Sequence, residues 1–167
     1  MTELTNEDIG KCYNFSYECL KTTKAYISKR NKYAATEKMI SDHFIGKLAE
    51  IHCYNYFSIN SECNYPDFEI TNNKTHGADL VVESENGKFN LHVKCVRFDS
   101  PVKNSWLAQK NEYSVKNPTA KDYYALCVFH NPKNIEIVKI TAAKNIHWKP
   151  TKANLPSKVA CYLEDMI

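Results

Sequence analysis

Apolar residues recur at helical spacing in two stretches near the start of the chain. The first stretch follows Thr5 and Asp8, and this Thr-x-x-Asp spacing is typical of a helix N-terminus. The second stretch runs from about residue 36 to residue 57. Their apolar positions are Ile9, Cys12, Tyr13, Tyr17 and Leu20 in the first, and Ile40, Phe44, Ile45, Leu48, Ala49, Ile51 and Tyr56 in the second. The sequence therefore predicts two amphipathic helices within residues 5–58, joined by a basic turn at 28–32.

The rest of the chain alternates β-rich runs with turn residues. Residues 66–70 are predicted as a short edge strand, because the proline at their start cannot donate to a strand ladder. Residues 78–97 are predicted as a hairpin, and the continuous apolar run at 123–129 is typical of a buried central strand. A further strand is predicted at 135–140, and a short helix is expected to begin at Ser105. This order predicts one α/β domain, residues 1–167, with a central mixed β-sheet flanked by helices.

The hairpin is predicted from Asn86-Gly87, which favours a type I′ turn with positive φ at both central residues. If these two residues form the loop, Glu85 pairs with Lys88. The same register places Asp79 opposite Lys94 and Val81 opposite His92.

Alternation along the second strand divides the hairpin into two chemically different faces. Successive side chains of a strand point to opposite sides. Phe89, Leu91, Val93 and Cys95 are therefore expected on an apolar side, whereas Asn90, His92, Lys94 and Asp79 are expected together on the other. A carboxylate, an imidazole and an ammonium on one face suggest a metal-dependent hydrolytic site.

Charge is distributed unevenly along the chain. Residues 1–83 contain 9 Lys/Arg and 12 Asp/Glu, whereas residues 88–158 contain 13 Lys/Arg and only 4 Asp/Glu. A one-sided positive field is expected for a protein that binds the phosphate backbone of a nucleic acid. The alternative interpretation is an ordinary solvated lysine surface.

The cysteines and the apolar runs indicate the expected compartment. The 7 cysteines include no Cys-x-x-Cys pair, which favours free thiols used as small hydrophobic residues. No apolar run is long enough for a membrane span, and residues 1–8 are acidic and lack the apolar core of a signal peptide. A cytoplasmic protein is expected, with no membrane association.

Four segments, in this order, resemble motifs of the PD-(D/E)xK nuclease superfamily. Gly46-Lys47-Leu48-Ala49-Glu50 resembles its helical glutamate, and His76-Gly77-Ala78-Asp79-Leu80-Val81-Val82 resembles the strand that presents its catalytic aspartate. Leu91-His92-Val93-Lys94 occupies the place of the (D/E)-x-K motif, and Ser105-Trp106-Leu107-Ala108-Gln109 resembles the helix that supplies a glutamine in several branches. The resemblance covers about residues 41–140 and implies a restriction-endonuclease-like three-layer sandwich.

The resemblance implies a divalent-metal-dependent endonuclease acting on DNA, of restriction, phage or repair type, with RNA not excluded as a substrate. It assigns Asp79 as the principal ligand of Mg²⁺ or Mn²⁺, with Glu50, His92 and the Val93 carbonyl as further ligands. Lys94 would orient the attacking water, and Gln109 would hydrogen-bond the water or the phosphate. A homodimer is compatible with this class, and the sequence identifies no interface.

One departure from the motif leaves two interpretations open. His92 stands where the superfamily has an acidic residue. If His92 ligates the metal, imidazole shifts the preference toward Mn²⁺. If the site has instead lost a needed carboxylate, the protein is a catalytically degenerate nucleic-acid-binding or regulatory protein on the same fold. A protein-interaction domain that binds no nucleic acid is a third class.

Each candidate residue also has a purely structural interpretation. Asp79 and Lys94 can be a cross-strand ion pair, and Glu50 can be an ordinary surface charge on its helix. His92 can be a common strand residue, and Gln109 can be a packing residue beside Trp106. Asp67, which follows a proline, is a weaker candidate than Asp79 because no apolar strand follows it.

Overall fold

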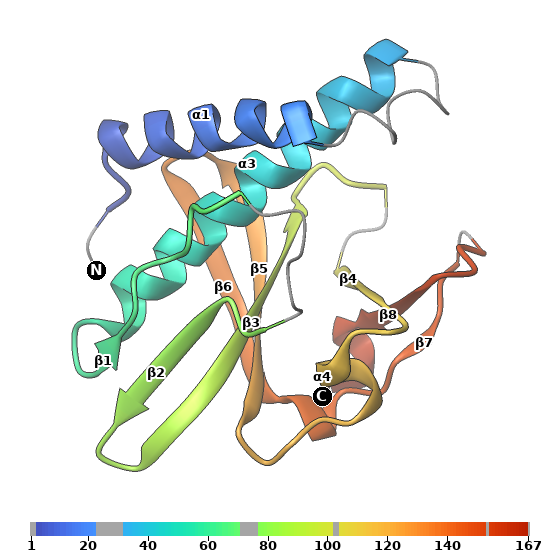
Figure 1. Cartoon of the computed structure of the whole chain (residues 1–167). Coiled ribbons are helices and arrows are strands. Elements are labelled where there is room, and N and C mark those ends of the chain that lie inside the picture. The colour runs from blue at the N-terminus through green and yellow to red at the C-terminus, as the bar shows by residue number, and fades with distance from the viewer. Residues whose placement is uncertain (1–2, 23–31, 71–76, 102–103, 153, 167) are drawn as a thin grey trace.

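The computed structural model describes residues 3–22, 32–70, 77–101, 104–152 and 154–166 (Figure 1). Most of the predicted basic turn at 28–32 lies outside these residues. Two long helices lie on one side of the molecule, α1 (Asn6–Thr22) and α3 (Lys32–Phe57). Both predicted helices are confirmed. None of the helices within the described residues is both long and apolar enough to cross a membrane.

The start of α1 confirms the predicted cap. The Asp8 carboxylate accepts the Thr5 backbone N–H at 2.9 Å, and the Thr5 hydroxyl accepts the Asp8 backbone N–H at 3.1 Å. This reciprocal pair satisfies donors that the first helical turn leaves without partners.

The central sheet has five strands in the order β1-β2-β3-β5-β6. They are β1 (Glu62–Cys63), β2 (Leu80–Ser84), β3 (Gly87–Arg97), β5 (Asp122–Asn131) and β6 (Asn134–Ala142). β3 and β5 pair in parallel and the other neighbours pair antiparallel, so the sheet is mixed. The predicted hairpin, the central strand and the strand after it are confirmed. α3 packs on one face of this sheet, and α1 packs against α3 (Figure 1).

The opposite face of the sheet packs on a second, smaller sheet in the order β4-β8-β7. Its strands are β4 (Ser105–Gln109), β7 (Lys149–Pro150) and β8 (Lys158–Tyr162), accompanied by the short helices α4 (Tyr113–Lys116), η1 (Ala143–Asn145) and η2 (Leu163–Met166). Trp106 from β4 and Tyr124 from β5 are fully buried between the two sheets. The mixed α/β architecture is confirmed, and the layer opposite the long helices is a small sheet with short helices.

Two predicted elements are wrong. Ser105–Gln109, predicted as a helix, is the strand β4, because its alternate side chains pack inward while the backbone pairs with β8. Residues 66–70, predicted as an edge strand, are irregular, and β1 takes the edge beside β2 instead. Phe68 packs edge-on against Phe15 of α1 with ring centroids 5.4 Å apart, so this segment is held by ring packing rather than strand pairing.

The hairpin register is also different from the prediction. Ser84 pairs with Gly87, so Glu85 and Asn86 form the loop, and Gly87 follows it with a φ of 113°. A type I′ turn at Asn86-Gly87 would require positive φ at both residues, and Asn86 does not have it. The pairing shifts by two residues, which places Asp79 level with His92 instead of Lys94. A two-residue shift keeps every side chain on its predicted face.

Candidate active site

Asp79 lies at the entry to β2 and hydrogen-bonds to β3 through both its backbone and its side chain. Its backbone N–H donates to the Leu91 carbonyl at 3.0 Å, and its Oδ2 accepts the Val93 N–H at 2.7 Å. The side chain thus takes the place of a further ladder bond where β2 begins. Oδ1 has no hydrogen-bond donor among the described residues. Asp79 is therefore fixed beside the residue that separates His92 from Lys94.

Lys94 forms a two-oxygen ion pair that the sequence did not predict. Its Nζ lies 3.1 Å from both Oε1 and Oε2 of Glu112. Glu112 Oε1 also accepts the backbone N–H of Gln109 at 3.0 Å. The side chains of Lys94 and Glu112 are 23% and 14% exposed, so the pair is largely shielded from water. The structure thus adds Glu112 to the candidate residues and brings Gln109 next to it through its backbone.

His92 lies on the predicted face and belongs to a buried polar cluster. Its Nε2 is 3.4 Å from Asp122 Oδ1, which also accepts the Asn90 amide at 3.2 Å. The other Asp122 oxygen accepts both the N–H and the hydroxyl of Thr119 at 2.7 Å. Burial by itself raises the pKa of Asp122, but the hydrogen bonds from Thr119, Asn90 and His92 outweigh it and hold this pKa below its ordinary value of 3.8.

Tyr124 lies next to His92, between the central sheet and the small sheet. Its ring lies 5.2 Å from the His92 ring, and its hydroxyl is 2.7 Å from the Ser114 hydroxyl. Burial raises the pKa of Tyr124, and the negative charges of Glu112 and Asp79 raise it further.

Glu50 lies in the middle of α3 and is paired with Lys47 at 2.5 Å. The two side chains are 12% and 8% exposed, and the Lys47 ammonium lies 5.1 Å from the centre of the Phe15 ring. Glu50 also helps to raise the pKa of Cys12 in α1, after the larger effect of burial. The carboxylate is thus directed into the packing between α3 and α1.

Two contacts show how α3 runs along β3. Arg97 Nη1 donates to the Ser41 hydroxyl at 2.6 Å, and the rings of Phe57 and Phe89 lie 5.7 Å apart. The helix therefore runs antiparallel to the strand, and Glu50, midway between these contacts, lies alongside the middle of β3. Among the described residues, no hydrogen bond joins Glu50 to Asp79.

The predicted metal ligands do not assemble as one set of side chains. Among the described residues, no three His, Cys, Asp or Glu side chains lie together as a metal site. The oxygen donors of this region are Glu112, which is bonded to Lys94, the carbonyl of the adjacent Val93, and Asp79, whose Oδ1 has no hydrogen-bond donor among the described residues. Mg²⁺ commonly binds through one or two carboxylates while it keeps several waters, so this reduced oxygen set fits that cation.

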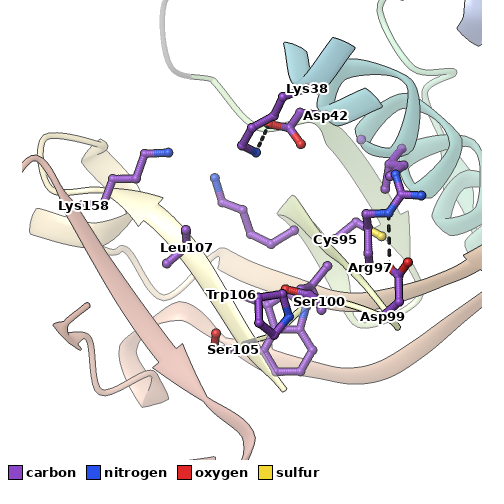
Figure 2. A pocket seen from close by; sticks show the side chains of 15 residues that line it. Lys38, Asp42, Cys95, Arg97, Asp99, Ser100, Ser105, Trp106, Leu107 and Lys158 are labelled. Atoms are coloured by element: carbon purple, nitrogen blue, oxygen red, sulfur yellow. Dashed lines mark hydrogen bonds and ion pairs between the residues drawn. The ribbon is translucent and has the colours of Figure 1, made fainter. Parts of the chain in front are cut away.

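A cleft of about 520 Å³ lies beside Lys94, between the N-terminal half of α3, the end of β3 and strand β4 (Figure 2). Its basic lining residues are Lys38, Lys94, Arg97 and Lys158, and its acidic ones are Asp42 and Asp99. This space is called the basic cleft below. It places four cationic side chains at the border of the candidate site.

Comparisons with protein-family models, with curated proteins and with solved structures found no match for this chain.

Proposed function

We propose that the chain is a divalent-metal-dependent endonuclease that acts on DNA and has a restriction-endonuclease-like fold. One observation carries the proposal. Asp79 is bound to Val93, and the adjacent Lys94 lines the basic cleft while it is held by Glu112. A carboxylate, an ammonium and a second carboxylate thus lie together next to a surface suited to phosphates.

The oxygen atoms of Asp79, Glu112 and Val93 would hold the Mg²⁺ or Mn²⁺ ion. Such an ion neutralises charge on the scissile phosphate and lowers the pKa of a bound water. Glu112 supplies the carboxylate that is missing at position 92. In this proposal His92 positions Asp122 and is not a ligand, so the Mn²⁺ preference that an imidazole ligand would bring is no longer expected.

Lys94 has the central role among the side chains. An ammonium carries three rotatable donors. Two of them are directed at Glu112, so Lys94 has one donor left for the attacking water or a phosphate oxygen. Glu112 fixes the direction of this ammonium through both of its oxygens. Gln109 would act through its backbone N–H, which fixes Glu112.

A second candidate function is a catalytically degenerate nucleic-acid-binding protein on the same fold. The observation that favours it is the internal pairing of the charged candidates. Lys94 is paired with Glu112, His92 with Asp122, and Glu50 with Lys47. A chain that binds nucleic acid without cutting it can keep all three pairs.

Cleavage of supercoiled plasmid with Mg²⁺, Mn²⁺ or EDTA tests the proposal. We expect nicking in either metal, loss of about 100-fold or more in Asp79→Asn and Lys94→Ala, and no activity in EDTA. Asp67→Asn and Lys88→Ala are matched controls, because both residues are exposed and neither lines the basic cleft. These controls should retain wild-type activity.

The two candidate functions give different results in this assay. If the wild type never cleaves plasmid, single-stranded DNA or RNA in either metal, the nuclease proposal fails. Salt-dependent DNA binding that persists in EDTA and in Asp79→Asn, without any cleavage, supports the degenerate binding protein.

A further inference from the structure

The basic cleft presents its cationic side chains from opposite walls. Lys38 belongs to α3, Lys158 to β8, and Arg97 to the end of β3. Figure 2 shows Lys38 and Lys158 extending from the two walls toward the space between them. An anion inside the cleft would therefore meet positive charge on both sides.

The acidic residues of the cleft hold these cations only weakly. Lys38 pairs with Asp42 at 2.7 Å, and Arg97 pairs with Asp99 at 3.3 Å. Both pairs are largely exposed to water, where ion pairs contribute little to stability. Within the described residues Lys158 has no ion-pair partner. Lys38 and Lys158 can thus turn to a phosphate at small cost, whereas Arg97 also donates to the Ser41 hydroxyl at 2.6 Å and would offer its remaining N–H groups.

The size and lining of the cleft indicate how much of a nucleic acid it accepts. Its volume of about 520 Å³ falls within the range of pockets that enclose small ligands. Leu107, which is 37% exposed, and the buried Trp106 add an apolar part to the lining. The bases of a duplex are paired and stacked inside it, so they cannot reach the apolar part of this space unless they are unpaired. One strand with an unpaired base fits both the charge and the apolar part.

We propose that the basic cleft binds a single strand of DNA, with Lys38, Arg97 and Lys158 on its phosphates and Leu107 against a base. The strand would pass Lys94, which lines the same cleft. This inference rests on the proposed function for the choice of DNA, but it requires neither a bound metal nor cleavage. It deepens that function to a preference for unpaired or single-stranded substrates.

Fluorescence anisotropy in EDTA tests this inference without cleavage. The probes are a labelled single-stranded DNA 12-mer, its duplex and the RNA of the same sequence. We expect the single strand to bind about tenfold more tightly than the duplex. Lys38→Ala and Lys158→Ala should each weaken binding several-fold and lower the slope of log affinity against log salt by about 0.7, the value for one lost phosphate contact on a single strand.

Two further variants make the test specific. Asp42→Asn should tighten binding about two- to fivefold, because it removes a repulsive charge and releases Lys38. Lys88→Ala removes a lysine of the same strand as Arg97 from outside the cleft, and it should change neither affinity nor salt slope.

The outcomes separate this inference from the proposed function. Equal or tighter binding of the duplex overturns the inference, as do tighter binding of RNA and unchanged affinities in Lys38→Ala and Lys158→Ala. If the single-strand preference holds while no metal supports cleavage, the inference stands and the nuclease proposal fails.

Discussion

The carboxylate of Asp79 accepts the backbone N–H of Val93 at 2.7 Å, so a side chain replaces a ladder bond at the point where β2 meets β3. Substitutions at Asp79 therefore affect folding as well as any chemistry. Asp79→Ala leaves the Val93 N–H without this acceptor and should lower the free energy of unfolding by about 1–3 kcal/mol. Asp79→Asn keeps a neutral acceptor and should lose roughly half as much, as measured by urea unfolding. Equal losses in the two variants would contradict this role.

The ion pair between Lys94 and Glu112 should contribute measurably to stability because it is largely shielded from water. We expect a coupling free energy of about 1–2 kcal/mol from a double-mutant cycle with Lys94→Ala and Glu112→Gln, measured by urea unfolding. The exposed pair Lys38–Asp42, at a shorter distance of 2.7 Å, is the matched control and should give about 0.5 kcal/mol or less. Similar couplings in the two cycles would show that shielding is not the cause.

The lowered pKa of Asp122 predicts how the stability of the protein changes in acid. Its pKa in the folded protein lies below its ordinary value of 3.8, so folding favours the ionised form. This contribution is present above about pH 4 and is lost as the pH falls through the lowered pKa. Urea unfolding of the wild type and Asp122→Asn should therefore give a stability difference at neutral pH that shrinks as the pH falls below about 4. A difference that stays constant over this range would rule out the carboxylate as its source.

Trp106 of the small sheet packs against the central sheet and hydrogen-bonds to it. Its indole N–H donates to the Cys127 carbonyl at 2.9 Å, and its side chain is buried. Trp106→Phe keeps most of the packing but removes the donor, so we expect a loss of about 1–3 kcal/mol in the free energy of unfolding. Trp106→Leu changes shape as well and should cost more. The intensity and wavelength of tryptophan fluorescence during unfolding provide a second readout in the wild type.

The seven cysteines should be unreactive in the folded protein, because all are free thiols, five are buried, and Cys63 and Cys95 are partly buried. Burial raises the pKa of Cys12 and Cys161 to about 12 and that of Cys63 to about 11. Since the thiolate is the reactive species, maleimide labelling near pH 7, followed by mass spectrometry, should be slow in the native protein and rapid in denaturant. Fast labelling of Cys12 in the native state would contradict its placement between the helices.

The elements with strong local patterns were predictable from the sequence. Thr5 and Asp8 make their cap from neighbouring residues, and the apolar run at 123–129 is strand β5. The hairpin was predicted with the right faces, because a two-residue slip preserves side-chain alternation. Its register was not predicted correctly. The loop is Glu85-Asn86 rather than Asn86-Gly87, and of these three residues only Gly87 has a positive φ.

The features that depend on distant pairing were not predictable. β4 is a strand because β8, some fifty residues later, lies beside it, and five residues of Ser-Trp-Leu-Ala-Gln carry no signal of that partner. The role of Glu112 follows from the turn after β4, which brings it to Lys94 across 18 positions of sequence. The excess of basic residues was visible in the sequence. The arrangement of α3, β3 and β8 that brings Lys38, Arg97 and Lys158 to one cleft was not.

β2 and β3 differ in length, which leaves part of β3 without a neighbour on one side. β2 accompanies β3 only as far as Leu91, whereas β5 accompanies it to Arg97, so the last part of β3 has a lateral edge with no described strand beside it. Exposed edges of this kind recruit strands from other molecules. Here the Asp79 carboxylate occupies the first open donor, and the charged Lys94 and Arg97 follow along the same stretch. These polar and charged groups therefore make the open edge of β3 unfavourable for pairing with a polypeptide strand. Under the proposed function, the same edge is where a nucleic-acid strand would reach Lys94.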